Sequence, residues 1–224
     1  LAGGPSVAIV VLPQASASED RGLASAQMFR NTGARHVDVV ELDDRDAARS
    51  KIESARLIWF PGGSQSKLYD ALDKAELVDL IRARHEAGVV FGGTSAGAAV
   101  MSDVMIPTSP AKPALRVGNT PIKRGLGLTP TLIVDQHFVE RQRMTRLLSA
   151  VLDHPQQLGV GISERTAILV HKDTIQVLGD GSVVIIDPRS AGVAVPNAGQ
   201  LQSARNLQIH VLKAGDQYKF DANK

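Results

Sequence analysis

A serine stands at the centre of a short motif of small residues, Gly93-Thr94-Ser95-Ala96-Gly97. The spacing fits the pattern G-x-S-x-G, in which a serine lies on a sharp turn between a strand and a helix. The flanking sequence agrees, because an apolar run at 89–91 predicts a buried strand and residues 96–101 predict the helix that follows it. We therefore expect the Ser95 hydroxyl at a helix N-terminus, where backbone N–H groups stabilise developing negative charge. The alternative is a glycine-rich turn that only packs a helix on a sheet.

A serine nucleophile needs a base within hydrogen-bond reach. The chain has six histidines, and His137 is the best candidate because it follows a predicted strand at 132–134. Open α/β sheets place their sites at the carboxyl ends of strands. We interpret the other five as surface or structural residues: His36, His85, His154, His171 and His210.

Two carboxylates compete to orient that base by accepting its N–H group. Glu164 lies between two apolar runs, where an unpaired carboxylate is costly, and we favour it. Its alternative roles are a salt bridge to Arg165 or a plain turn between strands. Asp135 precedes His137 by two residues, so both project to the same side of an extended segment, which suits contact with a substrate.

A tetrahedral intermediate at Ser95 needs two N–H donors. The N–H group of Ala96, directly after the nucleophile, is one. The second donor is expected from Pro61-Gly62-Gly63, which follows a predicted strand at 57–60, because glycines let the backbone approach a ligand closely. The alternative for the two glycines is a tight turn without a role in binding.

Composition limits the fold and the classes of function. The 224 residues suit one domain, 1–224, and the apolar fraction of 43% with 4% aromatics predicts a core of Val, Ile, Leu and Ala, typical of an α/β protein with a parallel sheet. The absence of cysteine excludes disulfides, cysteine-based zinc sites and a cysteine nucleophile. A net charge of +2 indicates neither a nucleic-acid nor a membrane partner, and no apolar run reaches the ~20 residues of a membrane span.

Other sequence features exclude some ligands and leave the compartment open. No G-x-G-x-x-G follows the first predicted strand and no P-loop lysine pattern occurs, so we do not expect a nucleotide ligand. The histidines are not clustered as metal ligands are, so we expect no metal. The chain begins at Leu1, which leaves secretion open, although a cytoplasmic location is favoured.

Strands and helices alternate through the first half of the chain. This alternation predicts right-handed β-α-β units and a mostly parallel sheet. The predicted strands are 6–12, 37–42, 57–60 and 89–91, and the predicted helices are 19–30, 46–54, 66–72 and 75–86.

The second half is less regular and predicts antiparallel ribbons. Residues 107–124 form a long loop, expected beside the active site or, alternatively, as a mobile surface insertion. A basic helix is predicted over 139–152, and Gly179-Asp180-Gly181-Ser182 predicts a hairpin between strands 174–178 and 183–186. Further strands are predicted at 159–162, 167–170 and 207–212.

Four separated blocks in one order carry a resemblance to a known family. They are FGGTSAGAAVMSDVMI at 91–106, GLGL at 125–128, DQHF at 135–138 with Arg141, Arg143 and Arg146 after it, and GISERTAI at 161–168. With these blocks the chain resembles the cyanophycinases, serine peptidases whose family also contains aspartyl dipeptidases. The resemblance extends from about Val7 to the last predicted strand.

The resemblance implies a fold, a reaction and a site. The fold would be the flavodoxin-like, three-layer sandwich of class I glutamine amidotransferases, with serine in place of cysteine. The reaction would be exopeptidase cleavage of cyanophycin, multi-L-arginyl-poly-L-aspartate, to β-Asp-Arg dipeptides through an acyl-enzyme. It implies no cofactor and a homodimer. It gives the nucleophile as Ser95, the base as His137, the carboxylate as Glu164, the oxyanion donors as Gly63 and Ala96, and the substrate contacts as Gln65, Asp135, Gln136, Arg141, Arg143 and Arg146.

The charges suit such a substrate, because arginine binds carboxylates through two parallel hydrogen bonds. Within a helix over 139–152, Arg143 and Arg146 would share a face. For the arginine side chain of the substrate we expect Asp135 as the acidic partner and Asp103 as second choice. The alternative functions are an aspartyl or isoaspartyl dipeptidase of the same family and a non-catalytic ligand-binding module.

Overall fold

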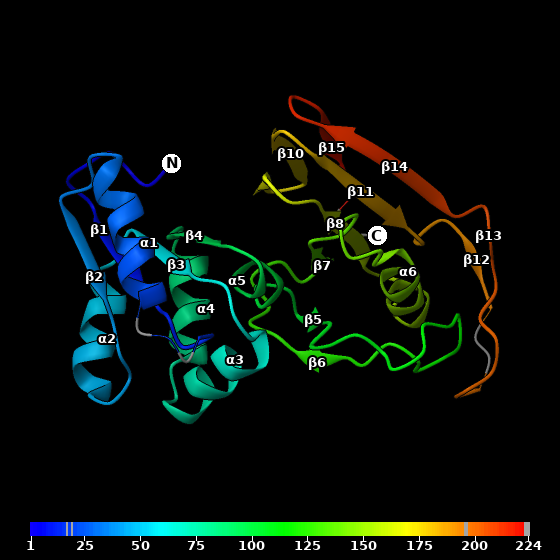
Figure 1. The fold of residues 1–224 in the computed structure, drawn as a ribbon, viewed down its shortest axis with the longest axis horizontal. Helices are drawn as coiled ribbons and strands as arrows, with labels where there is room; N and C mark the ends of the chain where they lie inside the picture. The colour runs from blue at the N-terminus through cyan, green and yellow to red at the C-terminus, as the bar shows by residue number, and fades with distance from the viewer. Residues whose placement is uncertain (17, 19, 195–196, 222–224) are drawn as a thin grey trace. The chain divides into compact units, whose positions relative to one another are not determined.

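The computed structural model describes residues 1–16, 18, 20–194 and 197–221 (Figure 1). Their contacts form two compact units. Unit 1 consists of Leu1–Met101 and Gly125–Leu128, and unit 2 of Ser102–Arg124 and Thr129–Lys224. A single domain over 1–224 stays a prediction, and it includes residues 17, 19, 195–196 and 222–224, which lie outside the described residues.

Unit 1 is built on a four-stranded parallel sheet. Its strands are β1 (Ala8–Val11), β2 (His36–Val39), β3 (Leu57–Phe60) and β4 (Val90–Gly93), in the order β2-β1-β3-β4. All four were expected from the sequence, and β3 has the predicted bounds. Strands β1, β3 and β4 are parallel neighbours. Their carboxyl ends therefore lie next to one another at the same end of the sheet.

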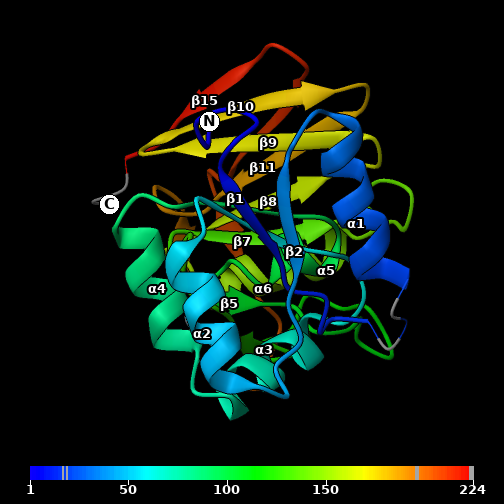
Figure 2. The same ribbon diagram turned by 90° about the vertical axis from the view of Figure 1, so that its left-hand side faces the viewer.

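Helices cover both faces of this sheet. They are α1 (Asp20–Asn31), α2 (Arg45–Ser54), α3 (Gln65–Lys74), α4 (Val78–Glu86) and the short α5 (Ala96–Ala99). Figure 2 shows α1 on one side of β1 and β2, and α2 with α4 on the other. The helix predicted over 19–30 therefore exists as α1, although Glu19 lies outside the described residues.

The two central strands of unit 1, β1 and β3, are apolar along their whole length because both of their faces are covered. On one face Ile9, Val11 and Val37 pack against Ala26 of α1. The residue between the first two, Val10, points to the other face and is 1% exposed, as expected from the alternation of side chains in a strand.

Unit 2 combines one helix with mostly antiparallel strands. Its main sheet has the order β14-β11-β8-β7, in which only β7 and β8 are parallel, and a second sheet has the order β15-β10-β9. The elements are β5 (Val104–Met105), β6 (Lys123–Arg124), β7 (Leu132–Gln136), α6 (Met144–Asp153), β8 (Leu158–Ile162), β9 (Thr166–His171), β10 (Thr174–Gly179), β11 (Ser182–Asp187), β12 (Gly192–Val193), β13 (Ala204–Arg205), β14 (Gln208–Lys213) and β15 (Gln217–Lys219).

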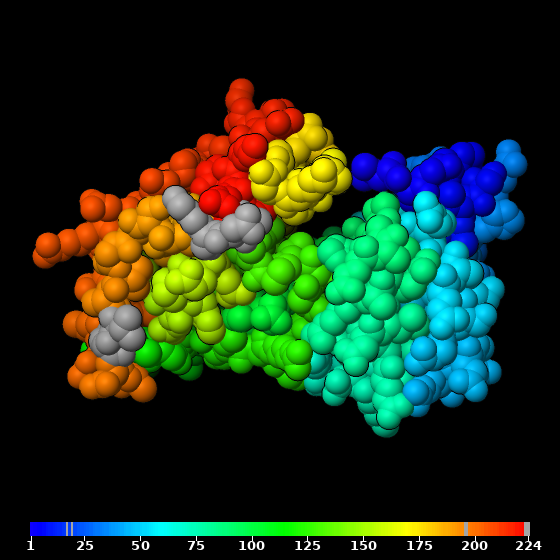
Figure 3. Space-filling view, turned by 180° about the vertical axis from the view of Figure 1, so that it is seen from behind, coloured from blue at the N-terminus to red at the C-terminus, as the bar shows by residue number. Residues whose placement is uncertain are grey.

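The core of unit 2 lies between its main sheet and α6. Leu147, Ala150 and Val151 of the helix pack against Ile133 of β7 and Ile186 of β11. The second sheet brings together segments that are distant in the sequence, and Figure 3 shows its yellow strands, β9 and β10, beside red residues of the C-terminal strands.

The predicted fold class is confirmed. The protein has a mixed α/β fold, with helices on both faces of a parallel sheet in unit 1 and antiparallel ribbons toward the C-terminus, in keeping with a flavodoxin-like, three-layer sandwich. Among the described residues, no helix combines the length and the apolar character that crossing a membrane requires.

The structure corrects two predictions for the second half, the start of a helix and the pairing of two strands. The basic helix begins at Met144, not at 139, because the segment before it turns back on itself: Gln142 has φ 52° and Arg143 N–H donates to the Phe138 carbonyl at 3.0 Å. The predicted hairpin does not form either. Strand β10 pairs with β9 and β15, while β11 pairs with β8 and β14, so residues 179–182 connect two sheets.

A polar cluster fastens the last strand of unit 2 to its main sheet. The carboxylate of Asp187 on β11 accepts hydrogen bonds from Arg189 Nη2 at 2.8 Å and from the Tyr218 hydroxyl at 3.0 Å. Burial raises the pKa of Asp187, but the hydrogen bonds from Arg189 and Tyr218 outweigh it, so the pKa lies below its ordinary value. Burial and the hydrogen bond to Asp187 together raise the pKa of Tyr218 to about 12.

We predict that Tyr218→Phe lowers the free energy of unfolding by about 1 kcal/mol at neutral pH, because Asp187 loses one donor. Since the pKa of Tyr218 is raised in the folded state, the wild type keeps this advantage below pH ~10 and loses it as the pH rises from ~10 toward 12. Urea unfolding across this range measures the difference. The control is Tyr69→Phe, at a buried tyrosine of unit 1 that does not contact Asp187. A difference that stays constant up to pH 12 would contradict the prediction.

Candidate active site

Ser95 occupies a strained turn in unit 1, between β4 and α5. Its backbone has φ 53° and ψ −116°, a conformation that residues with a side chain rarely adopt. The turn lies directly on β3, because Thr94 N–H donates to the Phe60 carbonyl at 3.0 Å. A Cβ atom built on Gly97 would lie 1.9 Å from the same carbonyl oxygen, so only glycine fits there. The structure thus has the strand, turn and helix that the G-x-S-x-G motif predicts.

Two backbone N–H groups of unit 1 are suited to bind an oxyanion. In the described residues no carbonyl accepts from the N–H of Ala96 or of Gly63. Gly63 has φ 149°, and a Cβ atom there would lie 2.2 Å from the Ala15 carbonyl oxygen, so the turn packs closely against the loop after β1. That Gly63 and Ala96 serve as the two donors stays a prediction.

His137 and Glu164 form a hydrogen-bonded pair in unit 2. His137 Nδ1 lies 2.8 Å from Glu164 Oε1, which places the ring proton on Nδ1 and leaves Nε2 as the basic nitrogen. The two residues follow β7 and β8, which are parallel neighbours, so their turns adjoin at one edge of the sheet. His137 has φ 51°, and Arg165, next to Glu164, has the same φ. The pairing is the one expected for a base and its orienting carboxylate.

Further hydrogen bonds hold the turn that carries Glu164, whose own side chain is half exposed. Its N–H donates to Glu140 Oε1 at 3.1 Å, and its carbonyl accepts from the Thr166 hydroxyl at 3.0 Å. Thr166 in turn accepts from Gly181 N–H at 3.0 Å. Sequence reasoning missed Glu140 and Thr166, because an exposed glutamate and a strand threonine carry no local signal of such a role.

Asp135 and Arg146 are buried against each other, two residues before His137 and within α6, respectively. Asp135 is 1% exposed and Arg146 is 6% exposed. Arg146 Nε donates to one carboxylate oxygen of Asp135 at 2.7 Å, and its Nη2 donates to the other. Arg143 Nη1 also donates to Asp135, at 3.3 Å. Asp135 is therefore already paired with two guanidinium groups of the protein, and its expected contact with a substrate arginine stays a prediction.

The remaining predicted binding residues differ in how they are placed. Arg143 also donates to the carbonyl and to the side chain of Gln136, so it braces the segment that leads into His137. Burial and the neighbouring charge of Arg146 lower the pKa of Arg143. Arg141 is exposed in the turn before α6, and Gln65, the first residue of α3, is buried.

The loop 107–124 is anchored within unit 2. Arg146 Nη1 donates to the Ser109 hydroxyl at 2.9 Å, and the Thr120 hydroxyl donates to the Arg146 carbonyl at 2.9 Å. Farther along, Gly118 N–H donates to Asp153 at 2.9 Å, and Val117 N–H donates to the Gln200 carbonyl at 3.0 Å. The first two bonds tie the loop to the same arginine that holds Asp135, and the other two tie it to the end of α6 and to Gln200.

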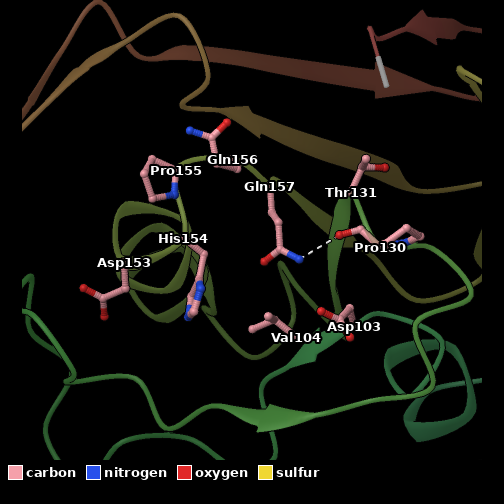
Figure 4. A pocket seen from close by; sticks show the side chains of 9 residues that line it. All are labelled: Asp103, Val104, Pro130, Thr131, Asp153, His154, Pro155, Gln156 and Gln157. Atoms are coloured by element: carbon pink, nitrogen blue, oxygen red, sulfur yellow. Dashed lines mark hydrogen bonds between the residues drawn. The ribbon is translucent and has the colours of Figure 1, made fainter. Parts of the chain in front are cut away.

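A hollow of about 580 Å³ lies elsewhere in unit 2 (Figure 4). Asp103 and His154 line it together with Gln157, whose amide donates to the Pro130 carbonyl at 2.7 Å. None of the residues predicted to form the catalytic site lines this hollow. Asp103 thus lines a hollow that neither His137 nor Glu164 lines, and its expected contact with a substrate arginine stays a prediction.

The chain is similar to several known proteins. The model of Peptidase family S51 matches residues 1–178. A cyanophycinase of Synechococcus elongatus is 40% identical to this chain, and the alignment covers 98% of this chain and 71% of the relative. A cyanophycinase of Geminocystis herdmanii is 36% identical, over 97% of this chain and 84% of the relative. The crystal structure of a peptidase from an acI-B1 Actinobacterium has the same fold, with a TM-score of 0.66 and 24% identity over 95% of this chain and 83% of its own.

We predict that Gly97→Ala destabilises the protein by about 3 kcal/mol or more, because the new methyl group meets the backbone of β3. Urea unfolding measures the loss. The matched control is Gly192→Ala, where a Cβ atom would meet open space and the free energy of unfolding should change by less than about 1 kcal/mol. Equal effects of the two substitutions would contradict the packing argument.

We also predict that Glu140→Ala loosens the pair His137–Glu164, because the Glu164 N–H group loses its acceptor. A hydrogen bond of about 1 kcal/mol corresponds to roughly fivefold faster solvent exchange of the His137 Nδ1 proton, which NMR measures. Glu140→Gln keeps an acceptor oxygen and should keep the wild-type exchange rate. If both variants exchange like the wild type, Glu140 does not hold the turn.

Proposed function

The chain belongs to peptidase family S51 and is a serine peptidase, and from this premise we propose that it hydrolyses cyanophycin to β-Asp-Arg dipeptides. The relatives that share 36–40% of its residues over almost the whole chain bear the name cyanophycinase. The observation that carries the peptidase chemistry is the pair of His137 and Glu164 at 2.8 Å, on the residues where sequence and resemblance both expect the base and its carboxylate.

The proposed reaction is acyl transfer to Ser95. His137 accepts the hydroxyl proton while Ser95 Oγ bonds to the carbonyl carbon of the scissile amide, and the N–H groups of Gly63 and Ala96 stabilise the oxyanion. The C–N bond then breaks, and the leaving amine takes the proton from His137. Water, deprotonated by the same histidine, hydrolyses the acyl-enzyme. Glu164 orients the imidazole throughout and stabilises its protonated form.

The arginines near His137 support an aspartyl substrate. Arg141 is exposed in the turn that follows the base, where its guanidinium can bind a carboxylate of the polymer. Arg143 braces the Gln136 backbone and remains a candidate contact, together with Gln65, Asp135, Gln136 and Arg146. Exopeptidase cleavage and a homodimer, which the resemblance implies, belong to the same proposal.

The proposal is tested by incubating the wild type and Ser95→Ala with insoluble cyanophycin and analysing the soluble products by mass spectrometry. We expect β-Asp-Arg from the wild type and a rate at least ~10⁴-fold lower for Ser95→Ala, because the nucleophile is lost. Ser54→Ala, at the exposed end of α2, should retain the wild-type rate.

Two results would contradict the proposal. A rate of Ser95→Ala close to that of the wild type would exclude Ser95 as the nucleophile. Cleavage of short isoaspartyl peptides without any release of β-Asp-Arg from the polymer would assign the enzyme to the dipeptidase activity instead.

A further inference from the structure

Arg21 lies beside the nucleophile turn of unit 1, although it is distant from Ser95 in the sequence. A Cβ atom built on Gly62 would lie 3.5 Å from Arg21 Nη1 and 3.4 Å from Ser95 Cβ. Because both atoms lie within 3.5 Å of this one point, Arg21 Nη1 is close to the Cβ atom of Ser95. Because residue 62 is glycine, no side chain at this position stands between them.

The packing of the sheet explains why Arg21 reaches this place. The loop that follows β1 crosses the end of β3, where Leu12 N–H donates to the Trp59 carbonyl at 2.9 Å and Ser64 N–H donates to the Ala15 carbonyl at 2.7 Å. Helix α1 begins after this loop, and Arg21 is its second residue. The first turn of α1 is therefore held at the same sheet edge as Gly62 and Ser95.

The Arg21 guanidinium differs from several other arginines of unit 1 in its contacts. Arg30, Arg82 and Arg84 each donate to a backbone carbonyl, so they serve the fold. Arg21 is exposed, and in the part of the chain that the structure describes it has no ion-pair partner. A guanidinium that is exposed beside a nucleophile is placed to bind an anionic group of the substrate.

We infer that Arg21 binds a carboxylate of the substrate next to the scissile carbonyl, and so helps to determine specificity for acidic peptides. The inference rests on the proposed function and assigns a recognition element to it. An arginine joined by an amide bond to the β-carboxyl group of aspartate keeps its own α-carboxylate, and the aspartyl backbone ends in a second one. Both groups are carboxylates close to a scissile amide, and both suit a planar guanidinium fork.

The test compares a short synthetic oligomer of β-Asp-Arg with two amidated forms, one with an amide at the backbone C-terminus and one with argininamide side chains. Arg21→Ala should lower kcat/KM on the unmodified oligomer by about 10- to 100-fold, mainly through KM, because a charged hydrogen-bonded contact is lost. For the wild type, kcat/KM on one of the amidated oligomers should be lower than on the unmodified oligomer by the same factor. For Arg21→Ala, kcat/KM on that amidated oligomer should equal its value on the unmodified oligomer. That oligomer identifies which carboxylate Arg21 binds.

Matched variants separate the contact from charge alone and from folding. Arg21→Lys keeps the charge but not the two-pronged geometry and should recover only part of the loss. Arg35→Ala, which removes another exposed arginine of unit 1, should behave as the wild type. Binding of the same oligomers to Ser95→Ala and to Ser95→Ala with Arg21→Ala, measured by calorimetry, gives a readout that needs no turnover.

The outcomes distinguish this inference from the proposed function. If the wild type cleaves the oligomer and Arg21→Ala does so within twofold, the inference is wrong and the proposed function stands. If the loss caused by Arg21→Ala is the same on all three oligomers, Arg21 binds neither carboxylate. If the wild type cleaves none of them, the proposed function fails. The inference is then decided by the binding measurements: it holds if binding to Ser95→Ala requires both Arg21 and a free carboxylate, and it is wrong if binding requires neither.

Discussion

The buried ion pair of Asp135 and Arg146 is the interaction on which the part of unit 2 around His137 depends. An unpaired charge at 1% exposure would be very costly, so the strand that carries Asp135 and the helix that carries Arg146 are stable only together. The same guanidinium binds Ser109, which fixes the loop 107–124, and Arg143 extends the network to the Gln136 carbonyl. His137 follows directly, so its unusual backbone conformation lies next to this network of charged groups.

Unit 1 fixes Ser95 by crowding of the backbone rather than by charge. Gly97 lies against the Phe60 carbonyl, Gly63 lies against the Ala15 carbonyl, and Thr94 is hydrogen-bonded to β3. A side chain at either glycine would displace main-chain atoms, which cannot move without disturbing the parallel sheet. Ser95 keeps a positive φ within this crowded backbone, and its side chain makes no capping hydrogen bond to the helix it precedes.

The two arrangements suit different requirements of acyl transfer. A nucleophile and its oxyanion donors must stay in place as charge develops, which a packed sheet edge provides without reorganisation. A base must hold one tautomer while its proton comes and goes, which requires a hydrogen-bonded carboxylate. Glu164 is half exposed, so burial alone does not orient it, and its turn is held by Glu140 and Thr166 instead. The positioning groups thus extend beyond the residues that touch the imidazole.

The sequence alone determined the parallel strands, the elbow around Ser95 and the pairing of His137 with Glu164, because these depend on apolar periodicity, on small residues at fixed spacing and on a four-block resemblance. Only the tertiary structure decided the start of α6, the partners of β10 and β11, the pairing of Asp135 with Arg146, and the place of Arg21. A local pattern does not encode them: Val139 and its neighbours suit a helix until Arg143 bonds back to Phe138, and a Gly-Asp-Gly turn suits a hairpin until β15 and β14 provide other edges. Contacts between residues distant in the sequence outweigh local preference wherever burial or charge is at stake.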